Sequence, residues 1–292
     1  MCNSKTYFLF SILTILRKSR SSVTTTIPNE TQSDGSFQYE TDNDDKKFEG
    51  YIVGGQNARI KDFPHSAFLA IKCQKVDYVH FTCGASILNQ VILLTAAHCF
   101  EDCEAGTKVL ASVGDRRKSK GTIYIIGQFA THEEYSARIM KNDIALAVLT
   151  EPLVFSSTVK RVLLSRFEIY NKPAQVAGWG VTNDTSHTQT LYLKWTRQVV
   201  LSPRKCLILV PKLSNGYICA SGDVKHDKDY GYAAVGDSGS ALVVKGFIQI
   251  GIVSYKISRL SNSLVLYTDV TKYIRWITSA SKQLYCRQFK FT

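Results

Sequence analysis

From Ile52 onward, the chain alternates short apolar runs with clusters of glycine, asparagine and aspartate. Short apolar runs that are bounded by turn-forming residues are typical of β-strands. On this basis we expect strands over residues 66–72, 86–96, 122–129, 144–149, 175–179, 191–201, 240–245, 247–255 and 264–268. Many short strands separated by turns indicate a β-barrel or a β-sandwich, so the expected fold class is all-β.

Only the C-terminal end of the chain shows a helical pattern. Thr271 is the expected N-cap of this helix, which should end near Gln283. Its predicted apolar stripe consists of Tyr273, Ile274, Trp276, Ile277 and Ala280.

The N-terminal part differs in composition and in its pattern of apolar residues. Residues 7–16 are an apolar run of ten behind Lys5, which suits a signal peptide over residues 1–18 and is too short to cross a bilayer. The basic residues that follow are no small-residue cleavage site, so a membrane-anchored start is the alternative to secretion. Residues 19–51 lack apolar periodicity and are expected to form a flexible acidic propeptide. No other segment is long enough to span a membrane.

The formal net charge of +12 is unevenly distributed. Residues 21–51 carry a net charge of −5 and residues 52–292 a net charge of +13, which favours anionic partners for the main part of the chain. One basic run is either a solvated loop or a site for acidic protein segments and sulfated glycans; it contains Arg116, Arg117, Lys118 and Lys120. No basic motif is interleaved with aromatic residues, so nucleic-acid binding is not expected.

With a secretory leader, the cysteines are expected to form disulfides. Cys2 falls in the leader and leaves seven others, so at least one thiol is free or pairs with another molecule. Paired CxxC spacing is absent, and we expect no metal site. Asn29 and Asn183 begin N-glycosylation sequons, which matter only if the chain is exported.

Ser238 is the strongest candidate for a reactive side chain. A serine hydroxyl becomes a good nucleophile only with a base, a group that orients the base, and donors for the oxyanion. In the segment GDSG, Gly236 would let its N–H approach the substrate, and Gly239 would permit a sharp turn. On its own this segment is also ordinary turn sequence. His98 after an apolar run and Asp143 before another are the candidate base and orienting carboxylate.

Several separated motifs occur together in one order: IVGG from Ile52, TAAHC around His98, NDIAL around Asp143, GWG at 178–180, GDSG around Ser238, and then Ser254-Tyr255. With these motifs the chain resembles the trypsin/chymotrypsin family of serine endopeptidases over residues 52–283. The resemblance implies two packed antiparallel six-stranded β-barrels, a C-terminal α-helix and a tail over residues 284–292. It also implies peptide-bond hydrolysis without a cofactor.

Position by position, the resemblance implies roles for the candidate residues. His98 would be the general base and later the general acid, and Asp143 would fix its tautomer. Ser238 would be the nucleophile, with the N–H groups of Gly236 and Ser238 as the oxyanion hole. Each residue alone could be merely structural, but their combination favours catalysis. Ser240 departs from the family, which usually has a glycine there.

The resemblance also implies disulfide pairs and leaves one cysteine over. Cys83 would pair with Cys99, and Cys206 with Cys219. A third pair, Cys73 with Cys103, is expected less strongly, and Cys286 is then the odd thiol.

Members of this family are made as zymogens, which implies an activating protease. Cleavage after Tyr51 would free the amine of Ile52, which would pair with Asp237 beside the nucleophile. Relatives usually carry arginine or lysine before the cut, so Tyr51 predicts a chymotrypsin-like activator.

The primary specificity pocket is unusual. Tyr232 stands six residues before Ser238, where aspartate would select arginine and lysine, and the wall positions correspond to Lys256 and Val265. We expect a shallow pocket that favours small or apolar P1 residues. Alternatively, Tyr232 swings away and the pocket is chymotrypsin-like.

The strand that carries Ser254, Tyr255 and Lys256 is expected to pair with the extended substrate backbone. A filled pocket also leaves open a catalytically weak or inactive homologue that acts as a binding protein.

Overall fold

The computed structural model describes residues 52–73, 80–101, 103, 107–139, 141–183, 188–222, 231–257, 260 and 263–289. Its strands are β1 (Gln56–Asn57), β2 (Ser66–Lys72), β3 (His80–Ile87), β4 (Ile92–Thr95), β5 (Lys108–Val113), β6 (Thr122–Thr131), β7 (Ala145–Leu149), β8 (Leu163–Leu164), β9 (Pro173–Gly178), β10 (Lys194–Val200), β11 (Tyr217–Gly222), β12 (Ala241–Val244), β13 (Ile248–Lys256) and β14 (Val265–Asp269). Its α-helices are α2 (Pro203–Leu209) and α3 (Ile274–Gln288), and its 3-10 turns are η1 (Ile60–Asp62), η2 (Ala97–Phe100), η3 (Ala137–Ile139) and η4 (Val270–Lys272).

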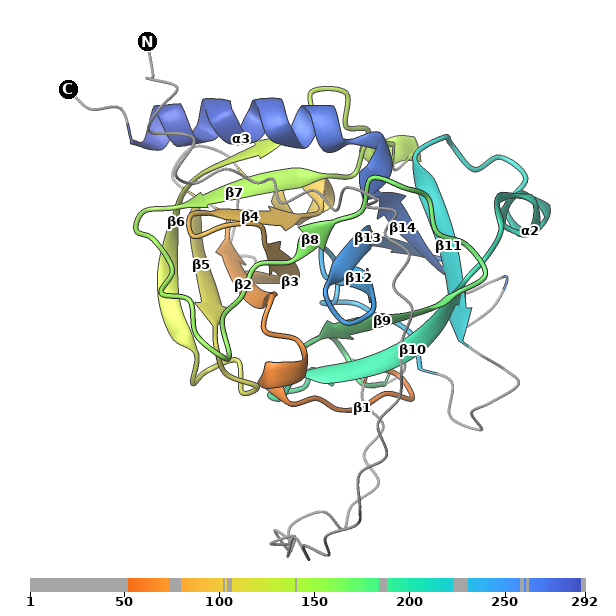
Figure 1. Cartoon of the computed structure of the whole chain (residues 1–292), viewed down its shortest axis with the longest axis horizontal. Coiled ribbons are helices and arrows are strands. Elements are labelled where there is room, and N and C mark those ends of the chain that lie inside the picture. Colours follow the sequence, from red (N-terminus) through yellow and green to blue (C-terminus); the bar gives the residue numbers. More distant parts are fainter. Residues whose placement is uncertain are drawn as a thin grey trace, which may run out of the picture. The chain divides into compact units, whose positions relative to one another are not determined.

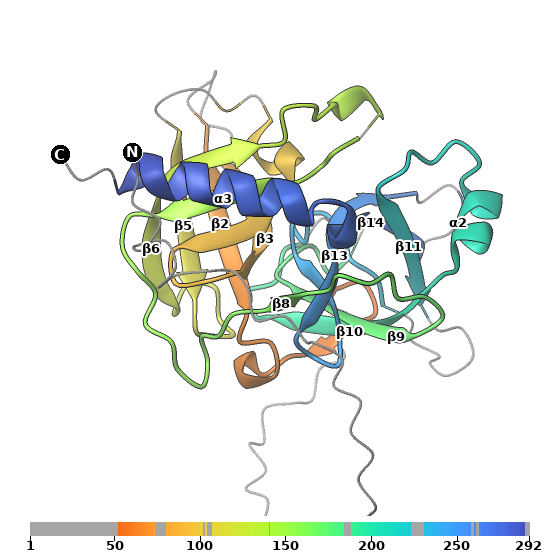
Figure 2. The same ribbon diagram turned by 45° about the horizontal axis from the view of Figure 1, so that its top comes forward.

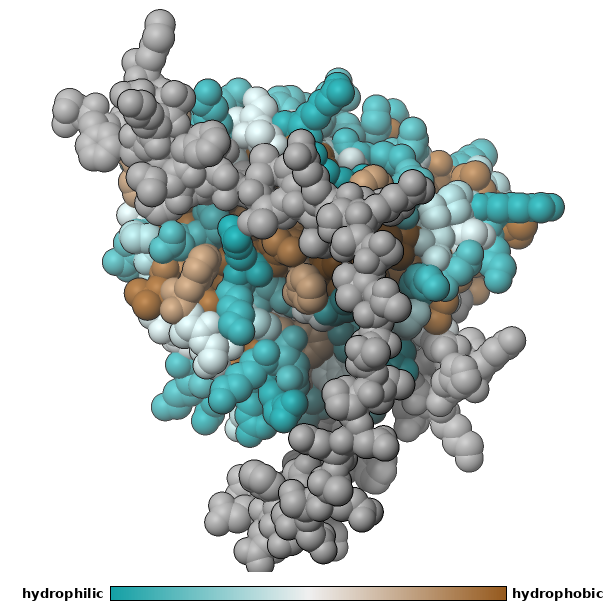
Figure 3. Space-filling model, viewed as in Figure 1, coloured by the Kyte–Doolittle hydropathy of each residue, from teal (hydrophilic) through white to brown (hydrophobic). Residues whose placement is uncertain are grey.

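Strands β2 to β7 form the first barrel, closed in the order β2-β3-β4-β7-β6-β5 with antiparallel neighbours throughout (Figure 1). Strands β4 and β7 are buried along their whole length, whereas β5 and β6 alternate buried and more exposed positions. Leu110, Ile123 and Ile125 are exposed on β5 and β6, and Figure 3 shows apolar surface at the left, where these strands lie.

Strands β9 to β14 form the second barrel in the order β9-β10-β11-β14-β13-β12, which the pairing of β12 with β9 closes. The short strands β1 and β8 add to it at β10 and β13. The two barrels lie side by side (Figure 2). The predicted fold of two six-stranded antiparallel barrels with a C-terminal helix is therefore confirmed.

The segment 86–96, predicted as one strand, is a hairpin. Strands β3 and β4 are separate because the side chain of Asn89 accepts hydrogen bonds from the N–H groups of Val91 and Ile92, at 2.9 and 2.8 Å. Such local side-chain bonds favour a turn over a continuous ladder. The sequence pattern also missed β5 and β11, and the expectation of a single helix was wrong because α2 is present.

Helix α3 packs on β6 and β7 and extends five residues beyond the predicted end at Gln283 (Figure 1). Its apolar stripe continues through Leu284 and Tyr285, which are buried with the first barrel. Thr271 is not its N-cap: the carboxylate of Asp269 accepts hydrogen bonds from the N–H and hydroxyl of Thr271 and so begins η4. Across the described part of the chain, no helix is long and apolar enough to cross a bilayer.

The structure joins Cys73 to Cys103, Cys83 to Cys99, and Cys206 to Cys219. Cys286 was expected to be the odd thiol, and this expectation was wrong. It is disulfide-bonded, to a partner outside the described residues. Disulfides of this kind stabilise a fold by typically about 2–4 kcal/mol.

Candidate active site

The three candidate catalytic residues lie on segments where the two barrels meet. His98 belongs to η2, directly after β4, and Asp143 precedes β7, both in the first barrel. Ser238 precedes β12 of the second barrel, and its carbonyl oxygen accepts a hydrogen bond of 2.7 Å from the N–H of Gly84 in β3. The backbones therefore bring the Ser238 segment against the first barrel.

Where the two barrels meet, there is no space for a side chain at Gly84. A Cβ placed there would lie 1.9 Å from the hydroxyl oxygen of Ser240. The serine that replaces the family's usual glycine is therefore buried against a glycine of the opposite barrel. The small size of both residues allows the close approach of the two barrels.

The structure brings His98 and Asp143 together. Nδ1 of His98 lies 2.8 Å from Oδ2 of Asp143, and the backbone N–H of His98 donates to Oδ1 at 2.9 Å. The carboxylate of Asp143 is fully buried, and the hydroxyl of Ser254 donates a third hydrogen bond to it. Because a carboxylate accepts and does not donate, it favours the tautomer with the proton on Nδ1 and leaves Nε2 as a base.

The backbone before Asp143 is held in an unusual conformation. Asn142 has a φ of 55°, a region that asparagine enters more readily than most residues. Its amide group donates to the carbonyl oxygen of Glu134 and accepts from the hydroxyl of Tyr273, both at 2.9 Å. The hydroxyl of Thr268 donates to the carbonyl of Asp143 at 2.8 Å. These bonds, which connect β14 and the N-cap residue of α3 to the site, fix the direction of the carboxylate.

The segment around Ser238 presents two unused donors. Gly236 and Gly239 have φ values of 92° and 83°, and a Cβ at Gly239 would lie 2.1 Å from Thr95 Oγ1, so both positions require glycine. Among the residues described, the N–H groups of Gly236 and Ser238 donate no hydrogen bond. Two free amides beside a serine hydroxyl are the arrangement that an oxyanion needs.

No hydrogen bond joins Ser238 Oγ to His98 within the described part of the chain, but Ser238 contacts the residue that follows His98. The Sγ of Cys99, the residue after His98, lies 3.9 Å from the carbonyl oxygen of Ser238. Catalytic hydrogen bonds are often long before substrate binds and tighten in the complex.

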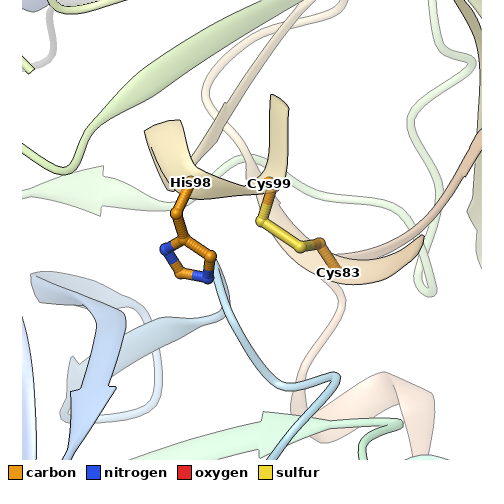
Figure 4. A group of neighbouring side chains, drawn as sticks. All are labelled: Cys83, His98 and Cys99. Carbon is orange, nitrogen blue, oxygen red and sulfur yellow. A yellow bond between two sulfur atoms is a disulfide. The ribbon is translucent and has the colours of Figure 1, made fainter. Parts of the chain in front are cut away.

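Figure 4 shows His98 beside the Cys83–Cys99 disulfide, with the imidazole and the sulfur leaving η2 in different directions. The potential metal-binding atoms of these residues lie within 4.8 Å of one another. Zinc binds thiolate sulfur, and both sulfurs here are held in the disulfide. The cluster therefore fixes the turn that carries His98 and does not fit a metal ion.

Asp237 is a fully buried carboxyl group. It accepts hydrogen bonds from the N–H groups of Gly180, at 2.8 Å, and Ala234, at 2.9 Å. Burial raises its pKa to about 7, and these two bonds offset only part of that effect. The glycines of the GWG motif make the space, because a Cβ at Gly178 would lie 2.1 Å from Oδ1. In the residues that the structure covers, no basic group pairs with Asp237.

The uncleaved chain should become less stable as the pH rises from about 4 to about 7. In this range the folded state keeps the proton of Asp237, whose pKa is raised from 3.8 to about 7, while the unfolded state loses it. Denaturant unfolding at pH 4.5 and 7, in a Ser238→Ala background that prevents self-cleavage, measures the dependence. Asp237→Asn should flatten it, and Asp62→Asn, at an exposed carboxylate, should leave it unchanged. Equal pH slopes in the Asp237→Asn and parent chains would contradict this prediction.

Ile52 is fully buried with a φ of 35°, and its carbonyl accepts a hydrogen bond from Gly55. The next residue, Val53, accepts a 3.0 Å hydrogen bond from the N–H of Tyr232.

Tyr51 and Asn29, the predicted cleavage position and one predicted glycosylation position, lie outside the described residues. Asn183, the other predicted glycosylation position, is exposed.

Tyr232 is buried. Its side chain is 6% exposed and belongs to the same apolar cluster as Val253 and Val265. The Nζ atom of Lys256 lies 3.9 Å from the centroid of its ring. Lys256 pairs in register with Val265 of β14, so the three pocket residues predicted from the sequence lie together.

The end of β13 extends beyond its pairing with β12. Ser254 is buried, while Tyr255 is 48% exposed. In the described structure, β12 pairs with β13 only as far as Ile252, whereas Tyr255 and Lys256 pair with Leu266 and Val265 of β14. An extended peptide can add to the edge of a sheet.

The basic run is held against aromatic side chains. The guanidinium groups of Arg116 and Arg117 lie 5.3 and 5.9 Å from the ring centroid of Tyr192, and the ammonium of Lys118 lies 5.1 Å from that of Phe68. Burial lowers the pKa of Lys118. The loop is thus positioned by cation–π contacts.

Three features of the site were not found from the sequence: the Ser254 and Thr268 hydroxyls on Asp143, the GWG glycines around Asp237, and the Lys256–Tyr232 contact. The sequence analysis named some of these residues but not their contacts. The partners in each contact are distant in the sequence, so no local pattern predicts that they meet.

Two antiparallel barrels with a histidine, a carboxylate and a glycine-flanked serine at their seam define a chymotrypsin-like serine protease architecture. The trypsin family model matches residues 52–277. Trypsin alpha of Drosophila erecta is 30% identical over 244 residues, which cover 82% of this chain and 90% of that protein. Hypodermin-B of Hypoderma lineatum is 32% identical over 242 residues, with coverage of 81% and 90%.

Two solved structures have a similar fold. The HL collagenase structure matches with a TM-score of 0.68 at 25% identity, over 79% of this chain and 98% of that one. The inactivated protease paralogue S-D1 of the scabies mite shares the fold, with a TM-score of 0.69 at 22% identity over 79% and 97%. This chain belongs to the trypsin family, whose members are serine proteases and hence hydrolases.

Proposed function

We propose that this protein is a serine endopeptidase that hydrolyses peptide bonds through an acyl-enzyme. The observation that carries the proposal is the buried Asp143 bonded to His98 Nδ1, together with amides at Gly236 and Ser238 that donate to no described residue. Ser238 Oγ attacks the substrate carbonyl, His98 Nε2 takes its proton, and the two amides hold the oxyanion. His98 then protonates the leaving amine, and a water molecule activated by the same base releases the acyl group.

The same proposal includes a secreted zymogen. We assign residues 1–18 to a signal peptide and residues 19–51 to an acidic propeptide, with the catalytic domain beginning at Ile52. An activating protease cuts after Tyr51, and Asn29 and Asn183 carry N-glycans. The disulfides support this assignment, because such bonds persist in oxidising compartments.

The P1 residue is small or apolar and is not arginine or lysine. Tyr232 and Val265 are buried at the positions expected to form the pocket, and no carboxylate stands at residue 232 to pair with a basic side chain. These buried, bulky residues support a shallow pocket that excludes long side chains.

Polyanions are a second proposed class of partner. Arg116, Arg117 and Lys118 are pre-positioned on Tyr192 and Phe68, with Lys120 next to them, so a sulfated glycan or an acidic segment would meet cations whose side chains are already ordered.

A weak or inactive homologue that acts as a binding protein is the competing function. The contact of Lys256 with Tyr232 supports a pocket that is filled by a side chain, and one structural neighbour is itself described as an inactivated protease.

Labelling with an organophosphate distinguishes these functions. The processed protein should take up one equivalent at Ser238, and Ser238→Ala should take up none, because only an activated serine attacks such a reagent. Retention of the Ser238→Ala protein on heparin would show polyanion binding that is independent of catalysis. A processed wild-type protein that resists labelling would favour the inactive homologue.

A further inference from the structure

We propose that Lys256 determines specificity, and that its ammonium group selects substrates with a short acidic residue, aspartate before glutamate, at P1. This inference rests on the proposed peptidase function and names the substrate class of that same site. Lys256 ends β13, two residues after Ser254, whose hydroxyl donates to the carboxylate of Asp143. The residue therefore lies on the strand that passes directly under the reacting groups.

The charge of Lys256 points to the base of the pocket. Its Nζ atom lies 3.9 Å from the ring centroid of Tyr232, the residue six positions before Ser238. The ring is buried, and the N–H of Tyr232 donates to the carbonyl of Val53, which holds the backbone in place. An aromatic face attracts a cation, so the ring keeps the ammonium over the pocket base.

The depth of the pocket limits the length of the side chain that can enter. Tyr232 stands at the position expected to form its base. Val265, which pairs with Lys256 across β13 and β14, is 1% exposed at the position expected to form its wall. Bulky residues at both positions favour a short side chain, in line with the small P1 residue proposed above. Arginine and lysine are too long and would also meet a like charge.

Among short P1 side chains, charge determines which one the enzyme prefers. Aspartate and asparagine have nearly the same shape, but only aspartate forms a charge-assisted hydrogen bond with an ammonium group, and such bonds are stronger than neutral ones. We therefore expect the kcat/KM for P1 aspartate to exceed that for P1 asparagine at least about tenfold, which corresponds to about 1.4 kcal/mol.

The test uses full-length protein that has been processed at Ile52, with the concentration of active sites measured by organophosphate titration. Peptide substrates differ only at P1, which is aspartate, asparagine, glutamate, alanine or arginine. Lys256→Met should bring the aspartate-to-asparagine ratio close to one. Lys256→Arg should keep the preference, because the charge remains. The matched control is Lys282→Met, at an exposed position of α3, which lowers the net charge equally and should not change the ratio.

Each outcome bears on one claim. A titratable enzyme that cleaves after aspartate and asparagine equally well, or whose preference survives Lys256→Met, overturns the role of Lys256 and leaves the peptidase function intact. Processed protein that takes no organophosphate label overturns the peptidase function and, with it, this inference.

Discussion

Asp143→Asn is expected to lower the kcat of the processed enzyme by roughly four orders of magnitude while leaving its fold intact. The buried carboxylate accepts three hydrogen bonds, from the backbone and Nδ1 of His98 and from the hydroxyl of Ser254. An asparagine amide has nearly the same shape, but its NH₂ group can face Nδ1 only as a donor. The imidazole would then carry its proton on Nε2, where it cannot accept the proton of Ser238.

The measurement compares kcat for one small-P1 peptide substrate with the thermal unfolding of the same preparations. Asp62→Asn is the matched control, since Asp62 is an exposed carboxylate in an ion pair with Arg59. It should leave kcat within about twofold. An Asp143→Asn enzyme that unfolds normally and retains a tenth of the wild-type kcat would show that this carboxylate does not orient the base.

The sequence predicted the parts of the fold that local patterns encode. Strands β2 and β7 appear nearly as expected because each is an apolar run between turn residues. Helix α2 was missed because its seven residues are too few to show a 3.6-residue period, although Ser202 and Pro203 form a helix-start signal that could have revealed it. The hairpin between β3 and β4 depends on one asparagine side chain, and an apolar run gives no sign of it.

The candidate site also has a part that local motifs predict and a part that only the packing reveals. His98, Asp143 and Ser238 could be selected because their motifs occur together, and the resemblance supplied their roles. The contacts among the proposed pocket residues join positions far apart in the chain: Lys256 reaches Tyr232 only because β13 and the segment before Ser238 belong to one barrel. Such a contact is a property of packing, and the identity of Lys256 alone does not reveal where its ammonium points.

Chymotrypsin, and not trypsin, is expected to activate the uncleaved chain by cutting the bond between Tyr51 and Ile52. The new amine has a reference pKa near 8 and is charged at neutral pH. Its proposed partner, Asp237, is buried without a cation among the described residues, and burial alone holds its pKa at about 7. Formation of the pair would stabilise the carboxylate and order the amides of the oxyanion hole, because Asp237 adjoins Ser238.

Removing one partner of a buried ion pair costs about 3–5 kcal/mol, so activity should rise by at least two orders of magnitude on cleavage. N-terminal sequencing of the active form should give Ile52 as its first residue. Tyr51→Arg should transfer activation from chymotrypsin to trypsin, and Asp237→Asn should be cleaved at the same bond without gaining activity. An active form that starts at Phe48, after Lys46-Lys47, would show that the buried partner of Asp237 is not the amine of Ile52, because four further residues would then separate that nitrogen from the chain terminus.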